Sequence, residues 1–220
     1  MLLQQIQSKI KGLVFDMDGV LVDTSPSHSV AYAQLWQSLA IHGPEYEEIA
    51  GRSTKDVVAQ YASHLNAEQQ QKVVAYKQTT ALEILSSAKI IYIDTQSALQ
   101  DFHALGLPMV VASSASAASA ELALNNADID HFFQAVVTSA NVQRSKPAPD
   151  LFLAGISDLG CSAENVLVFE DSLSGIQAGL ASGAYVVAVR DVPELNQSIT
   201  NHAKFIGHFD SLSAVVEAWQ

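Results

Sequence analysis

Two kinds of apolar pattern alternate along the chain. Short continuous apolar runs, too short for amphipathic helices, are typical of buried strands. These runs lie at residues 13–15, 108–112, 135–137, 166–169 and 184–189. A segment with the length and pattern of a helix precedes each of the last four runs. These segments lie at 95–105, 117–126, 150–159 and 174–182. Because helix-length connections between buried strands are crossovers, the pattern predicts an α/β fold with a parallel sheet.

The connection between the first two apolar runs is much longer than the others. It contains a helical segment of roughly seventy residues, which exceeds a normal crossover and whose apolar residues recur at helical spacing. One such set is Tyr32, Leu35, Trp36 and Leu39. Further helices are expected at 46–50, behind a cap at Ser53 or Thr54, and from 66 to 86. We therefore predict an all-helical domain at 25–91, inserted into a core formed by 1–24 and 92–220.

Three glycines recur four residues apart around the last predicted helix, at Gly175, Gly179 and Gly183. Without side chains at these positions, the helix can lie close on the sheet. We interpret the three glycines as structural and expect no chemistry of them.

Composition and charge narrow the functional class. Of 220 residues, 49% are hydrophobic and 15% charged, which is typical of a globular chain rather than a disordered one. Eleven Lys and Arg stand against 23 Asp and Glu, and the formal net charge of −12 opposes binding to nucleic acid or acidic membranes. This charge also opposes a phosphorylated substrate, so a phosphate site would need local cations.

No segment has the pattern of a membrane span or a secretion signal. No apolar run approaches the ~20 residues that cross a bilayer, and residues 1–12 lack a continuous apolar h-region and a cleavage site. The single cysteine, Cys161, excludes an intrachain disulfide. We therefore expect a cytoplasmic, reduced setting, with no membrane and no nucleic-acid partner.

Two aspartates end the first predicted strand. Asp16 and Asp18 follow the apolar run at 13–15, and Gly19 lets the backbone turn sharply behind them. Two neighbouring carboxylates repel, so a cation must hold one ionised or the other must carry a proton. This difference suits a nucleophile next to a general acid and base. The alternative is an Asp-Gly turn with an incidental second acid; a calcium loop is excluded, because no glutamate closes twelve residues.

Polar residues also follow two later strands. They are Ser113 and Ser114, and Glu170 and Asp171. Lys146 precedes Pro147, which disfavours helical backbone at the lysine and fixes an extended approach before the next helix. Taken singly, the serines could cap a helix, the acids could sit at a helix start and Lys146 could be a surface residue. Because carboxyl ends of parallel strands share one sheet edge, we expect these groups to meet.

The order of these motifs resembles the four signatures of the haloacid dehalogenase (HAD) superfamily. In chain order the four segments are Asp-x-Asp-Gly-Val-x-x-Asp-Thr from Asp16, the serine pair from Ser113, Lys-Pro-x-Pro-Asp from Lys146 and Phe-Glu-Asp-Ser-x-x-Gly from Phe169. The last two are similar to the β-phosphoglucomutase-like and sugar-phosphate phosphatase branch, and the similarity runs from Leu13 to Val189. It implies a Rossmann-like parallel-sheet core with an inserted helical cap. The second aspartate is kept by the phosphoryl-transfer members and missing from dehalogenases.

The resemblance implies a residue for each chemical step. Asp16 would attack phosphorus and form an aspartyl-phosphate, while Asp18, oriented by Thr24, would protonate the leaving group and then activate water. Mg²⁺ would neutralise charge, with ligands from Asp16, Asp171, the Asp18 carbonyl and, as a further candidate, Glu170. The phosphate would be held by Lys146, the Ser113 hydroxyl and the Ser114 amide.

Three residues of the predicted cap are candidates for substrate contacts. His28 matches a substrate-side histidine of β-phosphoglucomutase, and Lys77 matches a cap lysine that approaches the substrate phosphate. Arg52 lies in the segment 51–54, which resembles the family's substrate-specificity loop. The alternative is that all three are solvated surface residues.

Departures from the mutase pattern favour a phosphatase. A mutase binds a second phosphate with an arginine where this chain has Thr54, and with a lysine where it has Ser116. The family's Leu-Pro-Gly before the second strand is replaced by 92–94, Tyr-Ile-Asp. We predict a monomeric phosphatase for a small sugar or polyol phosphate. The alternatives are a sugar phosphomutase and a non-catalytic binding protein on the same fold.

Overall fold

The computed structural model describes residues 2–88, 90–190, 192 and 195–220. Its sheet has the strand order β3-β2-β1-β4-β5-β6, and every neighbouring pair is parallel. The strands are β1 (Gly12–Phe15), β2 (Met109–Ala112), β3 (Ala135–Val137), β4 (Val166–Glu170), β5 (Tyr185–Val189) and β6 (Phe205–Phe209). The predicted α/β fold class is confirmed.

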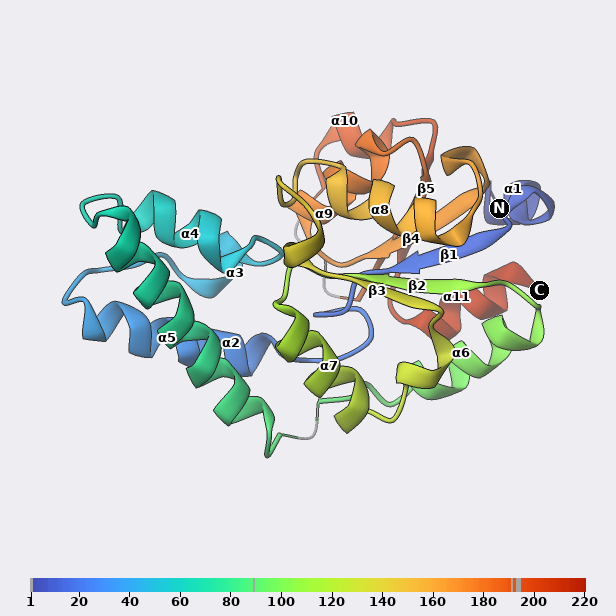
Figure 1. Cartoon of the computed structure of the whole chain (residues 1–220). Coiled ribbons are helices and arrows are strands. Elements are labelled where there is room, and N and C mark those ends of the chain that lie inside the picture. The colour runs from blue at the N-terminus through green and yellow to red at the C-terminus, as the bar shows by residue number, and fades with distance from the viewer. Residues whose placement is uncertain (1, 89, 191, 193–194) are drawn as a thin grey trace.

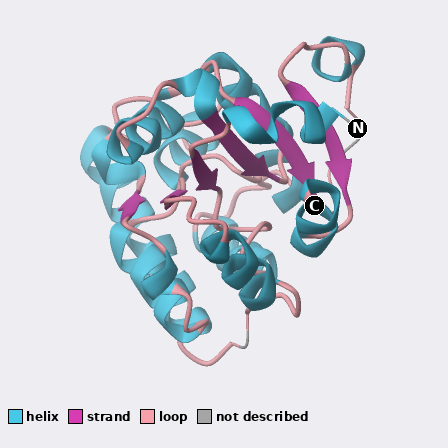
Figure 2. Cartoon of the chain, turned by 90° about the vertical axis from the view of Figure 1, so that its right-hand side faces the viewer, coloured by secondary structure: helices cyan, strands magenta, loops and turns pink. Residues whose placement is uncertain are grey.

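Helices cover both faces of this sheet (Figure 2). One face packs against α1 (Leu2–Ile6), α6 (Thr95–Ala104), α7 (Ala117–Asn126) and α11 (Leu212–Trp219). The other packs against α8 (Asp150–Leu159), α9 (Leu173–Ala181) and α10 (Gln197–Thr200). Neighbouring strand residues divide between the faces as the pleat requires: Phe15 stacks on Phe169 at 4.3 Å between ring centroids, whereas Val14 belongs to the opposite core. Because both faces are buried, the strands are continuous apolar runs.

Four helices of the insertion lie beyond one end of the sheet (Figure 1). They are α2 (Ser25–Ser38), α3 (Tyr46–Ile49), α4 (Thr54–Tyr61) and α5 (Ala67–Leu85). They have their own apolar cluster, centred on Leu35, Ile49 and Val57. Ser53 and Asn66 cap α4 and α5 by accepting main-chain N–H groups with their side chains. That this group forms a domain with the limits 25–91 stays a prediction, and residues 1, 89, 191, 193 and 194 of the predicted ranges lie outside the described residues.

The C-terminal part contains elements that no apolar pattern indicated. Strand β6 is an edge strand with a half-exposed pattern, and Gly207 and His208 interrupt its apolar residues. The sequence resemblance ended at Val189, before both β6 and α11. Short 3-10 turns complete the described structure, at Gln7–Lys9, Asp130–Phe132, Ser139–Asn141 and Ala163–Asn165. No described helix is both long and apolar enough to cross a membrane.

Candidate active site

Three charged side chains meet where β1 and β4 end. The Lys146 ammonium lies 2.5 Å from Asp16 Oδ1 and 2.6 Å from Glu170 Oε1. The side chains of Lys146 and Glu170 are fully buried, and that of Asp16 is nearly so. Burial alone would lower the pKa of Lys146, but the charges and hydrogen bonds of the two carboxylates raise it well above its ordinary value. The lysine is therefore a fixed positive charge inside the protein.

Glu170 is held by its own neighbours at the start of α9. Its Oε2 accepts hydrogen bonds from the main-chain N–H groups of Asp171 and Ser172, both at 2.9 Å, and from Ser172 Oγ at 3.0 Å. A Cβ on Gly175 would lie 1.7 Å from Glu170 Oε1. Gly175 therefore has the predicted structural role, and the close approach that it allows is to the Glu170 carboxylate at the end of β4. Gly179 also has the predicted packing role, since its Cβ would lie 2.9 Å from Val186.

A third carboxylate completes an acidic cluster. Oxygen atoms of Asp16, Glu170 and Asp171 lie within 4.8 Å of one another. Gly19, with φ of 86°, admits Asp171, whose Oδ2 would lie 1.7 Å from a Cβ at that glycine. Burial, reinforced by the neighbouring carboxylates, raises the pKa of Asp171, and it raises that of Asp16 to about 8 in spite of Lys146. Three carboxyl groups thus surround one ammonium, and their hard oxygen donors fit Mg²⁺, whose charge would favour the ionised carboxylates.

The predicted ligands differ in how freely they could reach an ion. Glu170 Oε2 already accepts three hydrogen bonds, which makes Glu170 a better support for Lys146 than a direct ligand. The carboxylate of Asp18 is not among the clustered groups, so this residue would contribute through its main-chain carbonyl, as the family resemblance implies. Asp16 and Asp171 remain the predicted side-chain ligands.

Asp18 turns toward the helical insertion instead. Thr24 Oγ1 donates a hydrogen bond to Asp18 Oδ1, and Ser113 Oγ donates to Oδ2 at 3.3 Å. His28 Nε2 lies 3.7 Å from Oδ1. Burial would raise the pKa of Asp18, but His28, Thr24 and Lys146 together lower it. The structure thus brings Thr24, Ser113 and His28 around one carboxylate.

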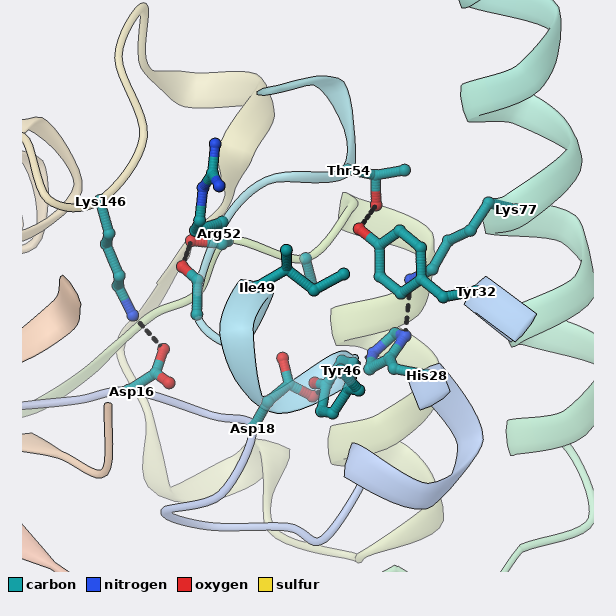
Figure 3. Close-up of a pocket in the computed structure, with 13 residues that line it drawn as sticks. Asp16, Asp18, His28, Tyr32, Tyr46, Ile49, Arg52, Thr54, Lys77 and Lys146 are labelled. Atoms are coloured by element: carbon teal, nitrogen blue, oxygen red, sulfur yellow. Dashed lines mark hydrogen bonds and ion pairs between the residues drawn. The ribbon is translucent and has the colours of Figure 1, made fainter. Parts of the chain in front are cut away.

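His28 and Lys77 form a buried pair in the insertion. Lys77 Nζ lies 2.8 Å from His28 Nδ1 and 4.4 Å from the centroid of the Tyr32 ring (Figure 3). Burial lowers the pKa of Lys77 to about 8, although Asp18 opposes this. The alternative in which these two residues are solvated was wrong, because Lys77 is 4% and His28 9% exposed.

Arg52 and Ser114 do not contact the acidic cluster. The Arg52 guanidinium donates to Gln60 Oε1 at 2.8 Å, and its side chain extends away from Asp16 (Figure 3). Ser114 Oγ donates to the main-chain carbonyl of Gly51 at 2.9 Å, which ties the insertion to the core. The predicted roles of Arg52 toward substrate and of the Ser114 amide toward phosphate stay predictions.

One cavity of about 50 Å³ is lined by the predicted site residues Asp16, Asp18, His28, Arg52, Lys77, Ser114 and Lys146. A water needs about 10–15 Å³ of such space, so the cavity holds only a few waters and a sugar phosphate could enter only if the insertion moved. Tyr32, Tyr46 and Ile49 also line it. These three residues were not predicted as site residues, because aromatic and apolar residues at helical spacing indicate packing alone.

Comparison with known families identifies the chain. A family model for haloacid dehalogenase-like hydrolases matches residues 13–189. The chain belongs to the haloacid dehalogenase-like hydrolases. This confirms the resemblance found in the sequence. A fructose-1-phosphate phosphatase of Escherichia coli is 33% identical over 184 residues, covering 81% of this chain and 96% of its own. Hexitol phosphatase A of the same organism is 29% identical, covering 86% of this chain and 88% of its own.

Solved structures share the fold of this HAD hydrolase. A β-phosphoglucomutase from Clostridium difficile matches with a TM-score of 0.81 and 21% identity, over 92% of both chains. CbbY from Rhodobacter sphaeroides, solved in complex with phosphate, has a TM-score of 0.80 and 19% identity, over 93% of this chain and 95% of its own. These likenesses show that the parallel six-stranded sheet with its flanking helices is a HAD fold.

Proposed function

We propose that this protein is a phosphatase that hydrolyses a small phosphorylated sugar or polyol with the help of Mg²⁺, through an aspartyl-phosphate on Asp16. The protein is a phosphoric monoester hydrolase, in line with its family and with relatives named as phosphatases. The observation that carries the proposal is the convergence of Asp16, Lys146 and Asp18 on one small cavity shared with His28 and Lys77. From its composition we further propose a cytoplasmic setting, and from the family resemblance a monomer.

Asp16 and Asp18 would divide the chemistry. A carboxylate oxygen of Asp16 attacks phosphorus, and the bond to the substrate oxygen breaks as Asp18 donates a proton to it. The phosphate's negative charge raises the pKa of Asp18 when substrate binds, which favours the protonated form needed for this step. Asp18, now ionised, takes a proton from water, which attacks phosphorus and releases inorganic phosphate and the Asp16 carboxylate.

Lys146 and the metal would handle the charge. The lysine, fixed by Glu170, is within reach of both Asp16 and a phosphoryl oxygen next to it, and it stabilises negative charge there. Mg²⁺, when held by Asp16 and Asp171, would neutralise the repulsion between an anionic nucleophile and an anionic substrate. Lys77 adds a second positive charge from the insertion side, 2.8 Å from His28.

A substrate screen tests this proposal. The protein would be incubated with sugar and polyol phosphates, with Mg²⁺ or with EDTA, and free phosphate and sugar-phosphate isomers would be measured. We expect phosphate release that depends on Mg²⁺. Isomerised sugar phosphate without release would instead indicate a mutase, and no turnover of any substrate would indicate a binding protein.

The nucleophile is tested in the same assay. Asp16→Asn should abolish phosphate release, because an amide cannot form the acyl phosphate. Asp101→Asn, on the exposed face of α6, is the matched control and should keep full activity. An active Asp16→Asn variant would rule out the aspartyl-phosphate route.

A further inference from the structure

Arg190, directly behind β5, contacts two separate stretches of chain. Its guanidinium donates through Nε to the carbonyl of Val20 at 3.0 Å and pairs with Asp94 Oδ1 at 3.0 Å. It also lies 3.7 Å from the centroid of the Tyr92 ring and donates to Thr95 Oγ1 at 3.3 Å. The side chain is 12% exposed. An arginine with this many partners in a protected place is held in one orientation.

The two stretches are the connections between the core and the helical insertion. The outgoing loop, residues 17–24, carries Asp18, and the return linker, residues 90–94, leads to α6. They lie side by side: Asp23 N–H donates to the carbonyl of Ile90 at 2.5 Å, and Val22 bridges Ile91 in antiparallel fashion. Arg190 therefore binds both connections where they leave the core.

The outgoing loop is tightly wound around the residues near Asp18. Gly19 N–H donates to the carbonyl of Val22 at 2.8 Å, and Leu21 N–H donates to that of Met17 at 2.9 Å. The carbonyl of Val20 points out of this turn and accepts from Arg190. The next carbonyl, that of Leu21, accepts a hydrogen bond from Thr95 Oγ1 at 2.8 Å. A shift of Val20 would thus move Asp18, two residues away.

This arrangement explains a departure from the family pattern. Where the family commonly has Leu-Pro-Gly, this chain has Tyr92, Ile93 and Asp94. Tyr92 and Asp94 both contact Arg190, and Asp94 Oδ2 also accepts from Ser213 N–H at 3.2 Å, at the start of α11. The replaced residues supply the acid and the ring that hold the arginine.

We propose that Arg190 is a positioning residue that fixes the outgoing loop, and with it Asp18, to the return linker and the core. The proposal rests on the proposed function, in which Asp18 is the acid and base. Arg190 does not touch the cavity; it acts through the Val20 carbonyl, and its ion pair with Asp94 keeps the guanidinium aimed at that carbonyl while the insertion opens and closes.

The test compares Arg190→Gln and Arg190→Lys with the wild type. Lysine keeps a positive charge for Asp94 but loses the planar fork that reaches Val20 and Asp94 together. With p-nitrophenyl phosphate and Mg²⁺, we expect kcat to fall about tenfold or more in both variants with KM changed less than about twofold, because misplaced groups affect the chemical step. Lys72→Gln removes an exposed cation that pairs with Glu68 and should match the wild type.

Amide hydrogen exchange supplies a readout that does not need activity. In Arg190→Gln, residues 17–24 should exchange faster, whereas strand β2 should keep its wild-type rates. If the wild type releases no phosphate, the proposed function fails, and the exchange rates alone decide whether Arg190 holds the loop. Unchanged exchange at 17–24, or a kcat equal to that of the wild type in a folded Arg190→Gln protein, would overturn the proposal.

Discussion

The core half and the cap half of the candidate site, the latter formed by the insertion, are built on different principles. In the core half, Asp16, Lys146 and Glu170 are buried ion-pair partners fixed at strand ends of a parallel sheet. In the cap half, His28 lies 3.7 Å from Asp18, and elsewhere the insertion contacts the core through single hydrogen bonds. Ser114 Oγ donates to the Gly51 carbonyl, and Ser145 Oγ donates to the carboxylate of Asp56.

The contacts of the two halves differ in the free energy that it costs to break them. Removing one partner of a buried ion pair leaves a charge without compensation, at a cost of about 3–5 kcal/mol. A neutral hydrogen bond at the edge of a cavity contributes only about 1 kcal/mol, because water replaces the lost partner. We therefore expect the core half to stay assembled while the cap half moves relative to it. The cavity of about 50 Å³ is too small for a sugar phosphate, so we expect the insertion to move when substrate binds.

The largest expected effect is in the core half. Lys146→Met should lower kcat/KM by about 10²–10³-fold, because a donor to the developing phosphoryl charge is lost. It should also destabilise the fold by about 3–5 kcal/mol, since two buried carboxylates lose their partner. Phosphate release and urea unfolding measure the two effects. Lys72→Met, an exposed lysine, is the control, and a Lys146→Met protein as stable as this control would contradict the ion-pair interpretation.

Two glycines in α9 separate an effect on the site from an effect on packing. Gly175→Ala would place a Cβ 1.7 Å from Glu170 Oε1, so the carboxylate and then Lys146 must move. We expect kcat to fall by about tenfold to a hundredfold, as for other small misplacements of reacting groups. Gly179→Ala would crowd Val186 instead, at 2.9 Å, and should lower the melting temperature with kcat retained. Equal kcat in the two variants would mean that Gly175 has no part in the site.

The cap half should respond to pH through Lys77. Its pKa is lowered by burial to about 8, so its charge is lost as pH rises through that value. The kcat/KM of the wild type should therefore fall above pH 8. Lys77→Met should have a kcat/KM lower by about tenfold at pH 7, the value of one charge-assisted contact, without this fall. A Lys77→Met profile parallel to that of the wild type would assign the fall to another group.

The lowered pKa of Lys77 also makes the free energy of unfolding depend on pH. Between pH 8 and the ordinary lysine value of 10.5, the unfolded chain binds more protons at Lys77 than the native chain does. The contribution of Lys77 to the free energy of unfolding therefore rises with pH across that window, because the cost of burying its charge is removed. Urea unfolding at several pH values should show this rise in the wild type, and it should be smaller in Lys77→Met.

The smallest expected effect concerns the contact that closes the cap. Ser145 directly precedes Lys146 in the chain. Ser145→Ala removes the hydroxyl that donates a hydrogen bond to the carboxylate of Asp56. Loss of about 1 kcal/mol from the closed state should raise KM a few-fold with little change in kcat. Ser38→Ala, whose hydroxyl bonds only within its own helix at Leu35, should behave as the wild type. A fall in kcat without a change in KM would place Ser145 in the chemistry rather than in closure.

The sequence by itself determined the elements whose signal is local. Buried parallel strands are continuous apolar runs, so β1 to β5 could be located from residue type alone. Helices α7 and α8 have the predicted limits, and Ser53 and Asn66 are caps because their short polar side chains satisfy the first free N–H groups. The strand-end positions of Asp16 and Glu170 followed from the same pattern.

Tertiary structure decided the properties that depend on contacts between distant residues. Strand β6 was missed because its half-exposed edge position leaves no continuous apolar run. The burial of Lys77 depends on His28, 49 positions earlier, and the place of Gly175 in the site depends on where the Glu170 carboxylate lies. Arg190 reaches Val20 across 170 positions. Periodicity reports which face of an element is buried, but it does not report which residue lies opposite, and that is set only when the elements pack.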